Sequence, residues 1–308
     1  MNYFYKNIKN TISDSKSENS NFESTRQRKF SSVIKTITLV MMLMVFGFSN
    51  AATITSTTTG GNWNATTTWV GGVVPSSTDD VVMGTNAIVN VTANATCATL
   101  TFSTASPQTT NLNISSGITF TVSGLITIPR PASGMNTLAV GAGILNAGSV
   151  AFTSGGGTSR HQITISTGTA TVSGDITQSG STGSATIIFS GTGLLKLGGA
   201  FLTSTTGTLT TVSGSTVEYN GIAQTVGNFT YNNLTLSGSG AKTITGTTIN
   251  GILSMEGTAT TTGTAPTYGA AATLQYKVLQ PMTMTENVTN YDVKVNVYGG
   301  GSTGQAEA

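Results

Sequence analysis

Asp79 and Asp80 are the only adjacent acidic residues in the chain. A pair of carboxylates can contact Ca²⁺, or it can supply the acid and base of a sugar-cleaving enzyme. Successive side chains of a strand point to opposite faces, so this pair alone does not provide the two facing carboxylates of a glycosidase. The D-x-D-x-D-G and G-G-x-G-x-D spacings of calcium sites are absent. We expect a turn or cap contact here, and Ca²⁺ is the one cofactor left open.

The chain has one histidine, His161, and one cysteine, Cys97. A zinc site needs several spaced His or Cys ligands, and a disulfide needs two cysteines, so neither is predicted. Cys97 lies in a run of small and apolar residues, and we expect it to be buried in a strand. Arg160 and His161 follow the glycine-rich residues 155–159, which predicts a solvated loop tip. No catalytic cluster is evident, so we predict that the protein is not an enzyme.

Trp63 and Trp69 are the only tryptophans of the chain. Two large aromatic side chains could cover the open end of a repeat array, where unpaired strand edges need a cap. The alternative is that their exposed faces stack on sugar rings. We favour the cap, and the possible ligand or cap contacts are therefore Trp63, Trp69, Asp79 and Asp80.

Residues 1–51 are predicted to be a leader with a signal peptide. Basic residues precede a short apolar run, Ile37–Phe48, and small residues follow it. The run is shorter than the roughly 20 residues of a membrane-spanning helix; an uncleaved anchor is the alternative. The remainder holds six Lys and Arg residues against eight Asp and Glu residues, a formal charge of −2. We therefore expect no membrane span after cleavage and no nucleic-acid partner.

Beyond residue 51 the chain predicts β-structure throughout. No window has the apolar spacing of an amphipathic helix, whereas short alternating runs bounded by Gly, Ser or Asn are typical of strands and turns. Mid-strand charges at Lys196, Glu218, Lys242 and Glu256 are expected to point outward. An apolar-x-apolar phrase followed by small residues recurs at nearly regular intervals, and it starts at Leu112, Leu138, Ile163, Ile187, Leu209 and Leu234.

A repeat of about 24 residues predicts the coils of a solenoid. Each coil has room for three sides, and glycine can adopt the φ > 0 conformation that tight corners require. We predict an all-β, right-handed parallel β-helix, a three-sided solenoid with an N-terminal capping segment; a β-sandwich is the alternative. The predicted regions are the leader 1–51, the cap or head 52–105, the coils 106–276, and a degenerate or truncated tail 277–308.

Two parts of the chain resemble a known family. Residues 59–82 contain the pattern G-x-W … T-W-x-G-G-x-x-P … D-x-V, and residues 214–224 and 231–246 carry similar coil phrases. They resemble Bacteroidetes-type β-strand-repeat surface proteins over roughly residues 53–276. The resemblance implies a secreted, adhesin-like protein. The C-terminal sorting domain common in such proteins is not found, which suggests a fragment.

The expected function is that of a non-catalytic, secreted structural or adhesive protein of the outer cell surface, with unspecified extracellular surfaces or glycans as partners. A polysaccharide-binding or polysaccharide-degrading β-helix is the alternative. An ice-binding solenoid is a lesser alternative, because Thr-x-Thr recurs, as in Thr119/Thr121 and Thr169/Thr171. That motif does not keep one offset from the predicted coil starts, which argues against a continuous threonine face.

Overall fold

A computed structural model of the protein describes residues 34–35, 51–105, 108–153, 160–179, 185–202, 207–277 and 296–297. The chain divides into two units, Met1–Asn50 and Ala51–Ala308, and the strands belong to the second. The predicted signal peptide, with Ile37–Phe48, lies outside the described residues, as does most of the tail 277–308. Among the described residues, no helix has the length and hydropathy needed to cross a membrane.

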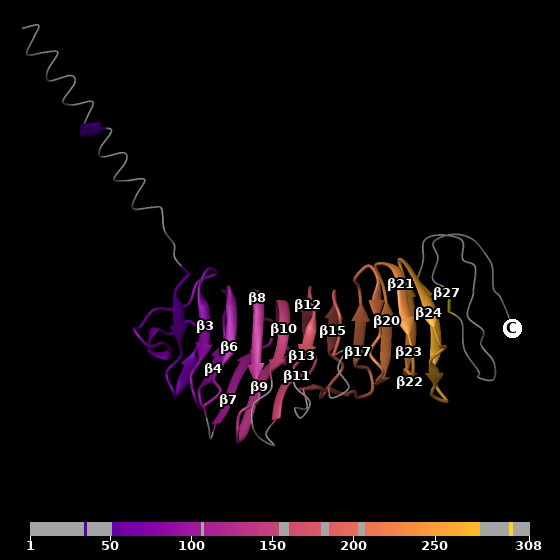
Figure 1. Ribbon diagram of the computed structural model, residues 1–308, viewed down its shortest axis with the longest axis horizontal. Coiled ribbons are helices and arrows are strands. Elements are labelled where there is room, and N and C mark those ends of the chain that lie inside the picture. Colours follow the sequence, from indigo (N-terminus) through magenta and orange to yellow (C-terminus); the bar gives the residue numbers. More distant parts are fainter. Residues whose placement is uncertain are drawn as a thin grey trace, which may run out of the picture. The chain divides into compact units, whose positions relative to one another are not determined.

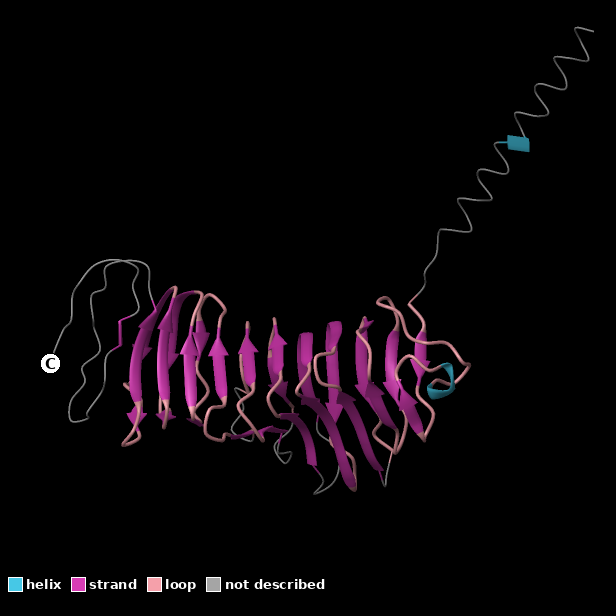
Figure 2. Ribbon diagram, turned by 180° about the vertical axis from the view of Figure 1, so that it is seen from behind, coloured by secondary structure: helices cyan, strands magenta, loops and turns pink. Residues whose placement is uncertain are grey.

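The second unit is an all-β solenoid built from parallel sheets, as the repeat predicted (Figure 1). Its strands are stacked side by side, with loops at the corners between them (Figure 2). A short 3₁₀-helix, η1 (Thr66–Thr68), lies near the N-terminal end of the stack. The predicted β-sandwich alternative is wrong, because every described strand pair in the sheets is parallel.

The largest sheet has 14 strands and forms two of the three sides. The first half of its strand β8 pairs with β5 and the second half with β6, so that β8 and its neighbour β10 continue around a corner. The strands are β1 (Thr53–Thr55), β3 (Asp80–Met83), β5 (Ala95–Cys97), β6 (Thr99–Phe102), β8 (Thr119–Pro129), β10 (Ile144–Thr153), β12 (Thr169–Val172), β13 (Ile176–Gln178), β15 (Leu194–Leu197), β17 (Thr216–Tyr219), β20 (Asn233–Leu236), β23 (Ile252–Glu256), β26 (Thr273–Lys277) and β27 (Asn296–Val297).

The remaining strands complete the coils. A seven-stranded sheet forms the third side of the N-terminal coils, with β2 (Gly60–Asn62), β4 (Ile88–Val91), β7 (Gln108–Ile114), β9 (Gly134–Gly141), β11 (Arg160–Ile165), β14 (Ala185–Phe189) and β16 (Thr208–Thr210). Beyond β17, two three-stranded sheets take the other sides, with β18 (Gln224–Thr225), β21 (Ser239–Ile244) and β24 (Thr258–Gly263) in one and β19 (Thr230–Tyr231), β22 (Thr248–Ile249) and β25 (Thr267–Tyr268) in the other.

Five of the six predicted coil starts stack directly on one another. They are Leu112, Leu138, Ile163, Ile187 and Leu209. The sixth is wrong: Leu234 lies on the largest sheet, between Val217 and Leu253. The coils become shorter here, since fewer residues separate Leu234 from each of these two partners than separate neighbouring coil starts earlier in the chain. The prediction assumed a constant coil length, and this assumption placed the sixth coil start on a different side of the solenoid from the other five.

Apolar side chains fill the interior in columns that run along the stack. One column passes through seven parallel strand pairs, and in each pair an apolar or aromatic side chain stacks on another. It contains Val122, Ala147, Val172, Leu197, Tyr219, Leu236, Met255 and Tyr276. All of these side chains are buried. Each coil shares its apolar contacts and its backbone ladder with its neighbours, which is why the array rather than the single coil is stable.

Some corner glycines serve a purpose that the sequence did not predict. Gly117 and Gly214 have the expected positive φ of 72° and 83°. Gly148 and Gly198 do not need positive φ, but a Cβ on them would lie 2.5 Å and 2.2 Å from backbone oxygens of the preceding coil. These two positions require glycine because the corners of adjacent coils approach too closely for a side chain.

Candidate functional site

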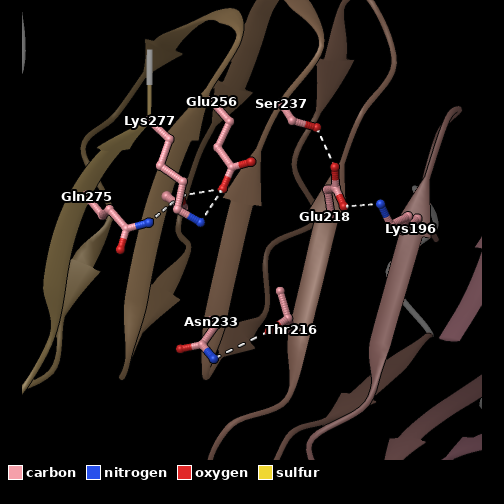
Figure 3. Close-up of polar contacts among 9 residues, drawn as sticks. Lys196, Thr216, Glu218, Asn233, Ser237, Glu256, Gln275 and Lys277 are labelled. Atoms are coloured by element: carbon pink, nitrogen blue, oxygen red, sulfur yellow. Dashed lines mark hydrogen bonds and ion pairs between the residues drawn. The ribbon is translucent and has the colours of Figure 1, made fainter. Parts of the chain in front are cut away.

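A row of polar side chains runs along the outer face of the largest sheet from β15 to β26 (Figure 3). This polar ladder consists of Lys196, Glu218, Thr235, Ser254 and Gln275, and strand register pairs each residue with the next. The residues on either side of each member in the strand are buried, so alternation along the strand directs the ladder outward. Ser254 is nevertheless only 3% exposed, whereas the other four members are partly exposed.

Two ion pairs flank and join the ladder. Lys196 Nζ lies 3.0 Å from Glu218 Oε2, and Ser237 Oγ donates a hydrogen bond to Glu218 Oε1 at 2.7 Å. Lys277 Nζ lies 3.0 Å from Glu256 Oε1 in the last complete coil. Both pairs are partly open to water, so each is expected to contribute little to stability. Each of these charges has an opposite charge beside it.

Neutral contacts continue the same surface. Asn233 Nδ2 donates to Thr216 Oγ1 at 3.4 Å, and Gln275 Nε2 donates to Ser254 Oγ at 3.3 Å (Figure 3). The described residues contain no group of three or more His, Cys, Asp or Glu residues placed to hold a metal ion. The ladder is therefore a row of hydrogen-bond donors and acceptors that are largely paired with one another.

Trp63 and Trp69 both lie in the interior, each with 2% of its surface exposed. Their ring centroids are 4.8 Å apart in an edge-to-face arrangement, and Trp63 makes a similar contact with Phe120. The backbone N–H of Trp63 donates to Asn90. Neither indole face is open to a sugar ring, so exposed stacking platforms are not what the structure shows.

Asp79 and Asp80 make separate contacts within the chain. Asp79 is buried, and it accepts hydrogen bonds from the hydroxyl and backbone N–H of Ser76 and from the N–H of Ala52. The Ser76 hydroxyl contributes most to holding the pKa of Asp79 below its usual value, and burial opposes this effect. Asp80 accepts from Thr99 Oγ1 at 2.6 Å. The structure therefore does not bring the two carboxylates to one shared partner.

Cys97 is a buried residue at the end of β5, as predicted. Burial raises the pKa of its thiol to about 12, with a further contribution from the charges of Asp80 and Asp79. At neutral pH the thiol is therefore protonated and poorly nucleophilic.

His161 was predicted at a solvated loop tip, and this prediction is wrong. The residue is fully buried in β11, where its ring packs edge-on against Phe152. The carbonyl oxygen of Ile128 lies 2.9 Å from Nδ1 and can only accept, so Nδ1 carries the proton. Nε2 has no hydrogen-bond partner within the part of the chain that the structure describes. The preceding residues 154–159 lie outside the described residues.

The buried position of His161 is explained by a short column of polar residues that points into the interior. Thr110, Asn136 and His161 are stacked by strand register. Each bonds a carbonyl oxygen near the end of a strand on the adjoining side: Thr110 that of Gly84, and Asn136 that of Pro129. The column therefore satisfies backbone acceptors at one corner of successive coils.

Lys242 is also buried, although it was predicted to point outward. Its ammonium group donates to the backbone oxygens of Gly221 and Ile222 and to Oε1 of Gln224. Gln224 in turn donates to the carbonyl oxygen of Leu197 at 2.8 Å. No carboxylate takes part in these bonds, and burial lowers the pKa of Lys242. This pair links the corners of three successive coils.

The threonine pairs do not form a continuous face. Contrary to the prediction from their offsets, the pairs Thr119/Thr121 and Thr169/Thr171 lie in the same two columns. Between the two pairs, however, these columns contain Ile144 and Asn146. The next coil places Leu194 and Lys196 in the column.

Comparison with known proteins points to the C-terminal part of the chain. Residues 252–308 match the family model of ribosomal protein S9/S16. The match begins at the first residue of β23 and includes β24, β25 and β26. The segment similar to a ribosomal protein therefore starts inside the solenoid.

Curated relatives agree with this match. The chain is 90% identical over 42 residues to small ribosomal subunit protein uS9 of Flavobacterium psychrophilum, which covers 14% of this chain and 33% of that protein. It is 68% identical over 41 residues to the protein of the same name from Christiangramia forsetii, covering 13% and 32%. The chain thus spans about a third of the length of these relatives. No solved structure matches the chain.

These similarities overturn the resemblance to Bacteroidetes-type surface proteins and the functions built on it. A secreted adhesive, polysaccharide-binding or ice-binding role and an extracellular location are contradicted, because the relatives are proteins of the small ribosomal subunit. The same matches contradict the expectation of glycan partners and no nucleic-acid partner. The matched relatives are ribosomal proteins, in agreement with a non-catalytic role for the matched segment.

Proposed function

We propose that the chain associates with the small ribosomal subunit through residues 252–308, and that the solenoid before them is a non-catalytic structural part. The observation that carries this proposal is the 90% identity over 42 residues to a small ribosomal subunit protein. Over those 42 residues nearly every side chain is the same in both proteins. The segment therefore has the residues for part of the same interface.

The charge of the segment indicates what kind of contact it can make. It contains two lysines and four acidic residues, a formal charge of −2: Glu256, Lys277, Glu286, Asp292, Lys294 and Glu307. A protein that neutralises many phosphates releases counterions, and its affinity falls steeply with salt. This segment cannot supply many such contacts. Its association is expected to rest on shape and hydrogen bonds and to depend only weakly on salt.

The chemistry of the described residues supports a role without catalysis. The charges of the polar ladder, Lys196 and Glu218, pair with each other, and the adjacent Lys277 and Glu256 form a second ion pair. His161 is fully buried, and the raised pKa of Cys97 keeps its thiol protonated. A structural contact surface needs none of these groups to react.

Sedimentation of the full chain with purified small ribosomal subunits tests the proposal. We expect the full chain to move with the subunits through a sucrose gradient, and to do so almost equally at low and moderate salt. The matched control keeps the solenoid but carries residues 278–308 in scrambled order, and it should remain at the top. A full chain that sediments no further than this control would overturn the proposal.

Mass spectrometry tests whether the solenoid and the ribosomal-like segment act as one polypeptide. Trypsin should release Thr243–Lys277 as a single peptide, because no Lys or Arg lies between Lys242 and Lys277. This peptide joins β22 to β26 across the start of the family match. We expect it in the ribosomal fraction of the source cells. If peptides from both parts were found without this joining peptide, the two parts would not act as one polypeptide, and the solenoid would have no place in the proposed function.

A further inference from the structure

The outer face of the largest sheet carries two rows of outward side chains that run across its strands. The polar ladder is part of one row, which also contains Thr121, Asn146 and Thr171 on β8, β10 and β12. The other row lies two residues earlier in each strand and consists of Thr119, Ile144, Thr169, Leu194, Thr216, Asn233, Ile252 and Thr273. Apart from Ser254, every member of both rows is at least partly exposed. The face is therefore accessible to a partner.

The two rows contain two charged residues, and these are neighbours. Lys196 and Glu218 lie on the adjacent strands β15 and β17, with Nζ and Oε2 3.0 Å apart (Figure 3). A two-fold axis parallel to the strands and midway between β15 and β17 places a second copy of the chain face to face on this sheet, with the strand directions aligned. It sets Lys196 of each copy opposite Glu218 of the other. The face is therefore electrostatically complementary to itself.

The same axis also brings exposed isoleucines together. Ile144 is 39% exposed and Ile252 is 38% exposed, and both belong to the row that lies earlier in the strands. Ile144 lies on β10, the third strand from the axis in one direction, and Ile252 lies on β23, the third strand in the other direction. The axis therefore sets Ile144 of each copy opposite Ile252 of the other. One symmetry operation thus pairs both the charges and the isoleucines, which are separate features of the sequence.

The charges also discriminate against neighbouring registers. An axis along β15 would set Lys196 against the same lysine of the second copy, and an axis along β17 would do the same for Glu218. Like charges that face each other across an interface oppose association. With the axis midway between these strands no like charges meet, because the two rows contain no other charged residue.

The area of the face is sufficient for a weak dimer. With strands about 4.8 Å apart and about 13 Å long, the face from β8 to β26 covers on the order of 500 Å² in each copy. Two copies therefore bury on the order of 1,000 Å², which is close to the lower limit for a specific interface. A dissociation constant on the order of 10 µM is expected for a contact of this size.

We propose that the protein forms a two-fold symmetric dimer through the outer face of its largest sheet. Lys196 and Glu218 of the two copies form a ring of four alternating charges at the centre, and Ile144 of each copy packs against Ile252 of the other. The partner is a second copy of this chain. This association goes beyond the proposed ribosomal function and does not depend on it, since the central charges precede the segment that matches the ribosomal family.

Charge reversal tests the arrangement at the centre of the dimer. Sedimentation velocity of the full chain up to about 200 µM measures the monomer–dimer equilibrium. We expect Lys196→Glu and Glu218→Lys each to weaken the dimer at least about tenfold, because each variant sets like charges opposite one another. An equimolar mixture of the two variants should dimerise again, because every facing pair in the mixed dimer is opposite in sign. This recovery also shows that neither variant has failed to fold.

Glu256→Lys is the matched control. It breaks the other ion pair, with Lys277, but position 256 lies outside both rows and faces Gly148 of the second copy. Its dissociation constant should equal that of the unmodified chain. An unmodified chain that stays monomeric at the highest concentration would overturn the proposal. So would charge-reversal variants that dimerise like the unmodified chain, or a mixture that stays as dissociated as its two components.

Cross-linking tests the register of the two copies. Chains with Ile144→Cys and chains with Ile252→Cys are mixed and treated with a bis-maleimide of about 8 Å reach, close to the roughly 10 Å between packed sheets. We expect at least about fivefold more cross-linked dimer in the mixture than with either variant alone, because the axis sets position 144 opposite position 252 and not opposite itself. The native Cys97 is buried and should not react. Equal cross-linking in the mixture and in the single variants would overturn this register.

Discussion

Trp69 donates a hydrogen bond from its indole Nε1 to the backbone carbonyl oxygen of Trp63, at 2.6 Å, in the interior of the first coils. The two rings also meet edge to face, and Trp63 continues the contact to Phe120. A buried indole needs both apolar neighbours and a partner for its N–H group, and here one residue supplies both. That these tryptophans close the N-terminal end of the solenoid stays a prediction.

Substitution of the tryptophans tests this. We expect Trp69→Ala to lower the free energy of unfolding by about 3–5 kcal/mol, because it leaves a large cavity. Trp69→Phe should cost about 1–3 kcal/mol, since it keeps a ring but leaves the carbonyl oxygen of Trp63 without its donor. Urea denaturation followed by circular dichroism measures both. Val70→Ala, at a neighbouring exposed position, is the control; a Trp69→Ala variant as stable as this control would refute the closure.

His161 should make the fold sensitive to mild acid. Burial lowers the pKa of the imidazole below its usual value of about 6.5, the Ile128 carbonyl opposes this, and the nearby Arg130 charge adds to it. The unfolded chain therefore binds a proton more readily than the folded one. Stability should be constant above about pH 6.5 and should fall as the pH drops below that value, until the lower pKa of the folded state is reached.

The variant His161→Asn isolates this effect. Asparagine is the residue that occupies the same column one coil earlier, at Asn136. We expect its thermal midpoint to change less between pH 7.5 and pH 5 than that of the unmodified protein, with little difference at pH 7.5. Parallel curves for the two proteins over this range would show that His161 does not cause the acid sensitivity.

Lys242 should contribute to stability through its three hydrogen bonds. In Lys242→Met the backbone oxygens of Gly221 and Ile222 lose their donor inside the corner, which is expected to cost about 1–3 kcal/mol. Removal of a buried charge acts in the opposite direction. Chemical denaturation, with Thr243→Ala on the exposed side of the same strand as control, gives the sign. A Lys242→Met protein more stable than the parent would mean that burial of the charge outweighs its hydrogen bonds.

The Lys196–Glu218 pair should matter little for stability. Both groups are partly exposed, and exposed pairs typically contribute about 0.2–1 kcal/mol. A double-mutant cycle with Lys196→Gln and Glu218→Gln is expected to give a coupling energy in this range that decreases as salt is added. A larger, salt-independent coupling would indicate that the polar ladder is rigidly organised, as an established binding surface would be.

Much of the fold could be predicted from the sequence because each coil repeats the same local pattern. Alternation of apolar and polar residues defines a strand, and the recurrence of one phrase predicts that Leu112 and Leu138 stack. The prediction failed at Leu234, where the coils shorten, because a period carries no information about changes in coil length. The burial of His161 could have been inferred from the sequence, because His161 lies two and four residues before Ile163 and Ile165. Alternate residues of a strand share a face, and both isoleucines point inward.

The sequence by itself determined the strands, the stacking and the likeness of residues 252–308 to a ribosomal protein, because each of these is a property of neighbouring residues or of a local match. Only the tertiary structure decided which partners the enclosed polar groups have. Lys242 and Gln224 lie on different coils and bond carbonyl oxygens contributed by earlier coils, so their burial depends on how corners stack. The pairing of β27 with β26 likewise joins residues that are a whole coil apart in the sequence. Hydrogen bonds between coils depend on distances in space, which local patterns of residue type do not specify.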